Sequence, residues 1–190
     1  MSRRYAVALF VVVAAAIAGG ALAALWPRWS RAPKAGAVAA AAAAPPAASG
    51  RRIKARLFYV SQDGTRLTGV ERDVPYGSGT VEQARQIIEA QIAPVAEPLV
   101  SPIPAGTRLR ALFVSEQGEA YLDLSREVAA GHAGGSTDEL LTVYALVDAL
   151  TANLPAVKSV QLLVDGRQVD TLAGHIDLRS PLAGNAAWVE

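Results

Sequence analysis

The chain has 190 residues, with 18 basic and 17 acidic side chains and no cysteine. The absence of cysteine excludes disulfides, thiol chemistry and a lipid-modified cysteine anchor. Five of the basic residues precede Gly50, so the remainder carries 13 basic against all 17 acidic residues and a charge near −4. That balance argues against a nucleic-acid-binding platform, which needs a basic face.

Residues 1–29 predict a membrane anchor or signal. Arg3 and Arg4 precede an uncharged run over 5–25, and about 20 apolar residues suffice to cross a bilayer. Trp26 and Trp29 follow, and tryptophan favours the membrane–water interface.

A cleaved signal peptide is the alternative, because Ala21-Leu-Ala23 is similar to an A-x-A cleavage site. We expect a single pass through the inner (cytoplasmic) membrane with the C-terminal domain extracytoplasmic, in the periplasm. A cleaved and secreted form is the alternative.

Residues 30–50 predict a disordered linker. They are rich in Ala, Pro and Gly, with a run of alanines over 39–44 followed by Pro45 and Pro46. Such a segment buries too little apolar surface to order itself. We expect it to act as a spacer between the membrane and a single domain at 51–190, which has the usual size of one domain.

The first half of that domain predicts two strands and a helix. Strands are expected at 53–60 and 67–74, separated by turn residues. Thr80 and Gln83 form a capping-box pattern before a helical run. The expected core stripe of this helix comprises Val81, Ala84, Ile87, Ile88 and Ile92. Four prolines between 94 and 104 then indicate an extended loop.

The second half of the domain again predicts two strands followed by a helix, and then two further strands. A hairpin is expected over 107–115 and 120–124, followed by a helix with Ser136 and Glu139 as a second capping box. The expected stripe of this helix comprises Leu140, Val143, Tyr144, Val147 and Leu150. A strand over 158–164 turns at Asp165-Gly166, a strong hairpin signal, into a return strand over 169–172 that extends through 175–178.

The predicted fold is α+β: one domain with a mostly antiparallel sheet packed by two helices, in the order β-β-α-β-β-α-β-β, after one N-terminal transmembrane helix and the linker. Tyr59, Phe113 and Tyr144 are expected in the core.

Five motifs in order resemble one known family. They are Gly118 with Asp123-Leu-Ser125; Gly134-Gly135-Ser136 with Glu139; a Val-Tyr-x-x-Val helix ending at Leu150-Thr151; Val157-x-x-Val160 before Asp165-Gly166; and Leu172-x-Gly174-His175-x-Asp177-Leu178. Their order and spacing are similar to the GerMN domain of sporulation and spore-germination proteins. The likeness covers roughly 53–182 and is sharpest after Gly118. Asp148 stands where the family often has Asn.

The resemblance implies an exported or membrane-attached domain without known catalysis, related to ring-building modules of envelope-spanning assemblies. From it we expect a non-catalytic domain that acts in protein–protein assembly or scaffolding in the bacterial cell envelope, through protein partners or self-association. The alternative is a module that binds peptidoglycan or another envelope glycan. Exposed aromatics would be needed for the alternative, and Tyr76, Tyr121 and Trp188 are the candidates.

The residues themselves point to no catalytic, cofactor-binding or metal site. His175 and Asp177 would share one face of a strand and could ligate a metal or act as a base and its orienter. The only other histidine, His132, lies in a Gly-rich stretch, and no third ligand is evident. We therefore expect His175 to fix the turn after Gly174 by hydrogen bonding.

Two serines are weighed as nucleophiles or caps. Ser125 lacks a nucleophile elbow, so it is expected to satisfy backbone groups at the end of its strand. Ser136 is expected to cap a helix. Asp138 and Glu139 beside it would repel phosphate, so this helix N-terminus is not expected to bind an anion.

Overall fold

The computed structural model describes residues 50–132 and 134–190. The predicted anchor at 1–29 and nearly all of the linker at 30–50 lie outside the described residues. None of the helices in the described ranges is long and apolar enough to cross a membrane. The elements, in chain order, are β1 (Arg52–Val60), β2 (Leu67–Pro75), α2 (Thr80–Ile92), β3 (Leu109–Val114), β4 (Glu119–Leu124), α3 (Glu127–Ala130), α4 (Ser136–Thr151), β5 (Ser159–Val164), β6 (Arg167–Gln168), β7 (Leu182–Ala183) and the 3-10 helix η1 (Ala186–Trp188).

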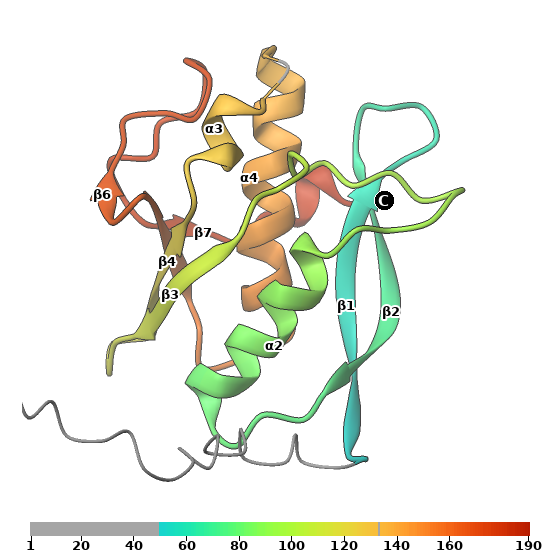
Figure 1. Cartoon of the computed structure of the whole chain (residues 1–190), viewed down its shortest axis with the longest axis vertical. Coiled ribbons are helices and arrows are strands. Elements are labelled where there is room, and N and C mark those ends of the chain that lie inside the picture. Colours follow the sequence, from blue (N-terminus) through green and yellow to red (C-terminus); the bar gives the residue numbers. More distant parts are fainter. Residues whose placement is uncertain (1–49, 133) are drawn as a thin grey trace, which may run out of the picture. The chain divides into compact units, whose positions relative to one another are not determined.

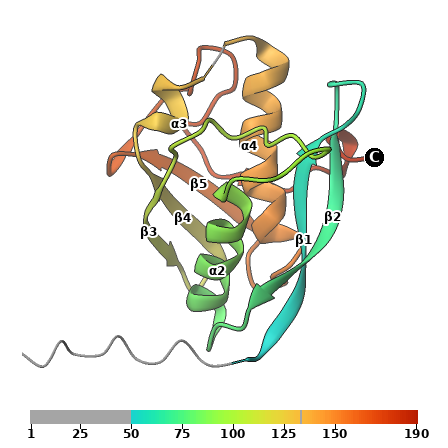
Figure 2. The same ribbon diagram turned by 45° about the vertical axis from the view of Figure 1, so that its right-hand side comes forward.

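The fold is α+β, but the single sheet of the prediction is wrong: the strands form two sheets. β1 and β2 make an antiparallel ribbon, and the second sheet has the order β3-β4-β5-β6, with β7 added beside β5. Helices α2 and α4 lie between the two sheets (Figures 1 and 2), where α4 packs on β1 and β5 and α2 packs on β1, β2 and β3.

The strand directions correct the prediction further. The hairpins β1–β2, β3–β4 and β5–β6 are antiparallel as expected, whereas β4 and β5 are parallel. Parallel neighbours need a crossover connection, and the chain makes it through α3 and α4. The short helix α3 was not predicted.

The turn at Asp165-Gly166 forms as the dipeptide predicts, with positive φ at both residues (49° and 76°). The return strand is only two residues long, however, and neither 169–172 nor 175–178 is a strand. Instead, the segment folds back on itself through a hydrogen bond from the Leu178 N–H to the Asp170 carbonyl (2.8 Å). The sheet is completed by β7, which pairs with the start of β5.

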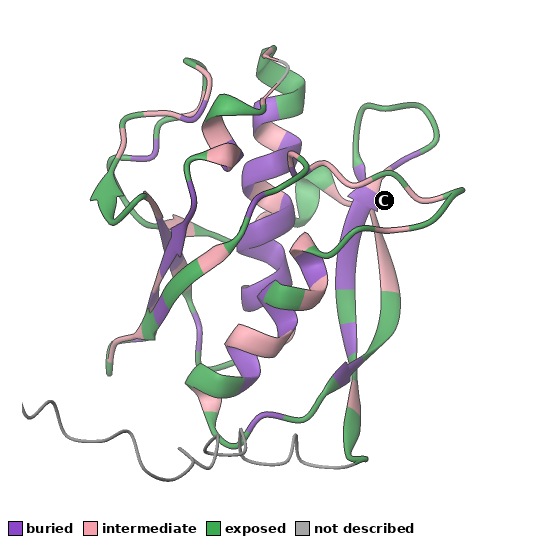
Figure 3. Cartoon of the chain, viewed as in Figure 1, coloured by how far each residue is buried: buried purple, intermediate pink, exposed green. Residues whose placement is uncertain are grey.

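Helix α4 is the centre of the core and is buried over most of its length (Figure 3). The predicted core positions Val147 and Val160 are fully buried, as are Ala84, Ile87 and Ile88 on α2. Two predicted core residues lie outside. Val81 is 40% exposed and Phe113 is 62% exposed. A strict helical or alternating pattern predicts burial at both positions, but no helix or strand among the described residues covers either side chain.

Neither predicted capping box forms. Thr80 and Ser136 are the first helical residues, and the N-cap positions are Gly79 and Gly135, which have positive φ and no side chain to cap with. Gln83 accepts a hydrogen bond from the Gly77 N–H (2.9 Å) and donates to the Pro75 carbonyl (3.2 Å). Gln83 therefore binds the chain that leads into its helix, whereas Glu139, at the equivalent position of α4, binds the distant loop that contains Leu172 and His175.

Two side-chain amides close the inner edge of β1. The Gln91 amide accepts from the Phe58 N–H (2.9 Å) and donates to the Phe58 carbonyl (2.7 Å). The Asn153 amide makes the same pair of bonds with Arg56, both 2.8 Å long. Each amide replaces one residue of a missing neighbouring strand, so the backbone groups of β1 stay paired without a further strand.

Candidate functional site

His175 lies in a loop and is tied to the buried Glu139 of α4. The Glu139 carboxylate is 0% exposed and accepts from the backbone N–H groups of Leu172 and His175, both at 2.8 Å. The His175 Nδ1 lies 3.1 Å from the same carboxylate, while its side chain is 43% exposed.

Electrostatics favour the charged form of Glu139. Burial raises the pKa of this carboxyl, but backbone N–H donors of residues 172, 173, 175 and 176 together outweigh burial and hold the pKa below its ordinary value. A carboxylate that accepts several N–H bonds is stabilised in this way. Glu139 therefore anchors the loop at 172–176, and His175 takes part as a hydrogen-bonding residue, as its motif predicts.

His175 and Asp177 do not come together as a pair on one strand face. Asp177 binds Arg179, which donates from its backbone N–H (3.0 Å), Nε (2.9 Å) and a terminal nitrogen (2.7 Å). The guanidinium holds the pKa of Asp177 well below its usual range. His132 lies elsewhere, against Thr142 (3.2 Å) and the Gly134 N–H (3.1 Å). In the described ranges, no three potential ligands gather as a metal site.

The Asp123-Leu-Ser125 motif ties strand ends together. The Ser125 hydroxyl accepts from the Arg108 N–H (3.0 Å), which is the turn role expected for it. Asp123 accepts from the Gly166 N–H (2.7 Å) and from the Nε of Arg110 (3.1 Å). Ser136 is exposed and caps nothing, contrary to its prediction.

The outer face of the β3–β4 hairpin carries two neighbouring aromatic side chains, the exposed Phe113 and the half-buried Tyr121. The Phe113 and Tyr121 rings are opposite one another in the register, with centroids 6.4 Å apart and planes inclined at 46°. The Tyr121 hydroxyl donates to Glu119 (3.0 Å), and this bond raises the Tyr121 pKa. β3 forms one edge of its sheet and β4 is the next strand inward, so Phe113 lies on the edge strand and Tyr121 on its neighbour.

The three aromatic residues that the glycan-binding alternative would need lie in different parts of the fold. Tyr76 follows the end of β2 and lies under the Arg51 guanidinium, 4.1 Å from it. Trp188 precedes Val189, which pairs with the opposite end of β2 at Leu67. Tyr121 belongs to the other sheet. They form no common platform.

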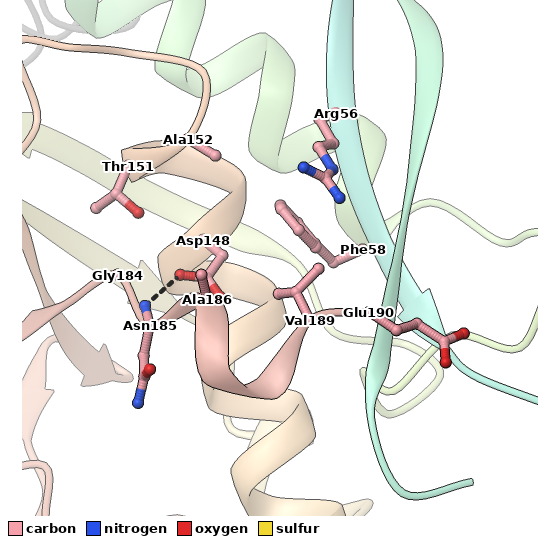
Figure 4. A pocket seen from close by; sticks show the side chains of 10 residues that line it. All are labelled: Arg56, Phe58, Asp148, Thr151, Ala152, Gly184, Asn185, Ala186, Val189 and Glu190. Atoms are coloured by element: carbon pink, nitrogen blue, oxygen red, sulfur yellow. Dashed lines mark hydrogen bonds between the residues drawn. The ribbon is translucent and has the colours of Figure 1, made fainter. Parts of the chain in front are cut away.

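A cavity of about 400 Å³ opens between β1, α4 and the C-terminal segment (Figure 4). Asp148 borders it and is only 5% exposed. One oxygen of its carboxyl accepts from the Asn185 N–H (2.9 Å), while the other has no hydrogen-bond partner among the described residues. Burial raises the pKa of Asp148, against the opposing effects of the Asn185 N–H and the Arg56 charge.

Sequence reasoning missed this cavity. The available signal was an acidic residue inside the apolar run Leu146–Leu150, at the position where the resemblance expects Asn. The remaining walls come from β1 and the C-terminal segment, and no sequence spacing connects them. The full lining is Arg56, Phe58, Asp148, Thr151, Ala152, Gly184, Asn185, Ala186, Val189 and Glu190.

A second hollow of about 560 Å³ lies at the other end of α4. It is lined mainly by the proline-containing loop over 100–105, together with Val60, His132, Asp138 and Leu141. Within it, His132 lies against the Thr142 hydroxyl and accepts from the Gly134 N–H.

Residues 56–170 match the profile of the family Germane, described as sporulation and spore germination. The chain belongs to this family. A search of curated proteins found no significant match.

Solved structures of other proteins show a similar fold. A putative lipoprotein from Clostridium perfringens is 21% identical, with a TM-score of 0.50 and a match covering 70% of this chain and 87% of that one. The tandem GerMN domains of the sporulation protein GerM from Bacillus subtilis are 16% identical, with a TM-score of 0.54 over 70% of this chain and 46% of that one. The first GerMN domain of GerM alone is 19% identical, with a TM-score of 0.50 over 69% and 97%.

Proposed function

We propose that this chain is a non-catalytic, membrane-tethered extracytoplasmic domain that acts in protein–protein assembly in the bacterial cell envelope. The observation that carries the proposal is Phe113, which is 62% exposed beside Tyr121 on the edge strand β3. Aromatic side chains are enriched in protein interfaces, and an unpaired strand edge can add a strand from a partner.

The edge strands β2 and β3 differ in charge, and this difference favours β3 as the binding edge. The outer part of β2 exposes Glu71, Arg72 and Asp73 in succession, and charged side chains on an edge oppose strand addition. β3 carries a single charged side chain, Arg110, which forms ion pairs with Asp123 and Asp165, and Ala111-Leu-Phe113 follows it. Partner binding is therefore expected on β3 and the adjoining outer face of the β3–β4 hairpin.

Location in the envelope is supported by relatives and by sequence. One similar structure is of a lipoprotein and another of a sporulation protein, and the apolar run over 5–25 provides a tether. Tethering raises the effective concentration of neighbouring copies, so weak association suffices.

Sedimentation velocity of the detergent-extracted full-length protein tests the proposal. Wild-type protein is expected to sediment as an oligomer or with a co-purifying envelope protein, and the Phe113→Asp variant as a monomer. Val81→Asp is the matched control, because Val81 is also an exposed apolar residue but lies on α2. A wild-type protein that is monomeric and free of partners at every concentration would contradict assembly.

Glycan binding is the alternative, favoured by the partial exposure of Tyr76 and Trp188. Purified sacculi distinguish the two functions. Retention of the monomeric protein on sacculi, lost in Trp188→Ala and kept in Phe113→Asp, would replace assembly by glycan binding.

A further inference from the structure

The cavity beside Asp148 is lined by one cationic side chain, Arg56, and by two acidic ones, Asp148 and Glu190. Glu190 accepts a hydrogen bond from the Thr68 hydroxyl, whereas Arg56 and Asp148 each have unused hydrogen-bonding capacity among the described residues. The ion pairs of the described ranges do not include Arg56. One oxygen of the Asp148 carboxyl is likewise unpartnered although buried. A buried acceptor without a donor costs free energy, so a ligand that supplies one gains by binding here.

The Arg56 side chain is held in place by its surroundings. Its backbone is fixed on both sides by the Asn153 amide. Its guanidinium carbon lies 5.6 Å from the centroid of the Phe58 ring, within the range of a cation–π interaction. The side chain also crosses Gly69 of β2, where an added Cβ would overlap the Arg56 Nε. Because Gly69 has no side chain, the Arg56 guanidinium can occupy the space beside it.

Asp148 is fixed from the opposite wall. It accepts from the Asn185 N–H, and an added Cβ at Gly184 would lie 3.0 Å from the same carboxyl oxygen. This close approach of the backbone holds the C-terminal segment against α4. Figure 4 shows Arg56 and Asp148 entering the cavity region from different elements, with Phe58 and Val189 between those elements.

We propose that this cavity binds a small free α-amino acid, with the ligand carboxylate on the Arg56 guanidinium and the ligand ammonium donating to Asp148. A guanidinium is suited to carboxylate binding. Opposite charges of the ligand match both groups at once, whereas a neutral sugar leaves both charges unmatched. The volume of about 400 Å³ is at the small end of ligand cavities. Phe58, Ala186 and Val189 provide apolar wall for a short aliphatic side chain.

Calorimetric titration of the full-length protein in detergent tests this with four probes. L-alanine and D-alanine carry both charges, N-acetylalanine lacks the ammonium, and alaninamide lacks the carboxylate. One of the two alanine enantiomers is expected to bind with a Kd of at most about 10 mM. Each of the blocked compounds is expected to bind about tenfold or more weakly, because one charge-assisted bond is lost.

Three variants test which residue binds the ammonium group of the ligand and which binds its carboxylate. Asp148→Asn keeps an acceptor for the Asn185 N–H, and should abolish the preference for alanine over N-acetylalanine. Arg56→Gln should abolish the preference for alanine over alaninamide. Gly69→Ala should weaken alanine binding by displacing the guanidinium without removing it. Glu89→Gln, an exposed change on α2, is the control and should bind as wild type.

Three results of these titrations would contradict amino-acid binding in the cavity. Absence of saturable binding of both alanines at about 10 mM would overturn it, as would binding that is equal in Asp148→Asn and wild type. Binding of N-acetylglucosamine in place of alanine would also overturn it. Melting curves of all four variants show that lost binding is not lost folding, and Gly69→Ala and Arg56→Gln serve if Asp148→Asn is unstable. Phe113 lies on the other sheet, so neither result affects the test of assembly.

Discussion

At the scale of single residues, two buried acids on α4 have opposite relations to their surroundings. Glu139 is surrounded by N–H donors that lower its pKa, whereas burial raises the pKa of Asp148. Both arise from one helix, and the loops that pack on it decide the difference.

Glu139 should make the fold sensitive to acid. A carboxyl with a folded-state pKa below its unfolded value adds stability above the unfolded value, and this is lost as pH falls through the folded value. Glu139→Gln keeps one acceptor but adds an amide N–H facing other donors. We expect it to lower the free energy of unfolding at pH 7 by about 2 kcal/mol and to flatten the loss of stability between neutral pH and pH 3. Thermal melts across this range provide the measurement, and an unchanged pH profile would show that Glu139 is not the anchor.

Asp148 should change the pH dependence of stability in the opposite direction to Glu139. Its folded-state pKa is raised, so the charged form costs stability as pH rises through the interval between the unfolded and folded values. Asp148→Asn removes this charge and is expected to melt at the same temperature as wild type or higher at pH 7, with a smaller advantage at pH 3. A melting temperature that is clearly lower at pH 7 would mean that the ionised carboxyl is stabilising.

His175 contributes less than its partner. Its ring is 43% exposed and makes one contact to Glu139, while the backbone N–H of the same residue remains in any substitution. His175→Ala should therefore cost about 1 kcal/mol or less. Metal analysis of the purified protein is the sharper check: stoichiometric metal that is lost in this variant would make His175 a ligand.

At the scale of elements, the side-chain amides of Gln91 and Asn153 explain how a two-stranded ribbon stays ordered, and we call this pair the amide clamp on β1. A two-stranded hairpin alone is marginal in water. Gln91→Ala would leave the buried N–H and carbonyl of Phe58 unpaired, and we expect a cost of about 2–4 kcal/mol. Gln86→Ala is the matched control on the same helix, because among the described residues the Gln86 amide donates only to the exposed Glu82 carboxylate and binds no backbone group. Equal denaturation midpoints for the two variants would contradict the clamp.

The elements also show where sequence patterns succeed. Strands β1 to β5 and helices α2 and α4 follow from alternation and helical spacing, and Asp165-Gly166 gives the expected hairpin. Such signals are local, so they are present in the chain itself. The hydrogen bonding expected of His175 is also observed, with Glu139 as the partner.

The remaining features depend on contacts between distant segments. Glu139 has the spacing of a capping residue, yet its partners are at 172–176. Gln91 and Phe58 are likewise distant in the sequence and meet only in the fold. The walls of the Asp148 cavity also come from three separate segments. The parallel pairing of β4 with β5 requires knowing that α4 packs across the sheet. Phe113 alternates like a core residue, and only the uncovered sheet face shows that it is exposed.

At the scale of the whole molecule, one helix supports both sheets, so a charge in this layer should unfold the domain as a unit. Val147 on α4 and Val160 on β5 are fully buried. Replacing either with Asp buries an unpaired charge and should cost at least about 3 kcal/mol. Circular dichroism melts check this, and variants that melt like wild type would contradict the packing described here.

We propose that the folded domain assembles through the β3 edge. In-cell photo-crosslinking of the full-length protein tests this most directly, with the crosslinking residue placed at Phe113 and, as a control, at Val81. We expect covalent adducts with a second copy or with one defined envelope protein from Phe113 and none from Val81. Absence of adducts from Phe113, or equal adducts from both positions, would contradict assembly through this surface.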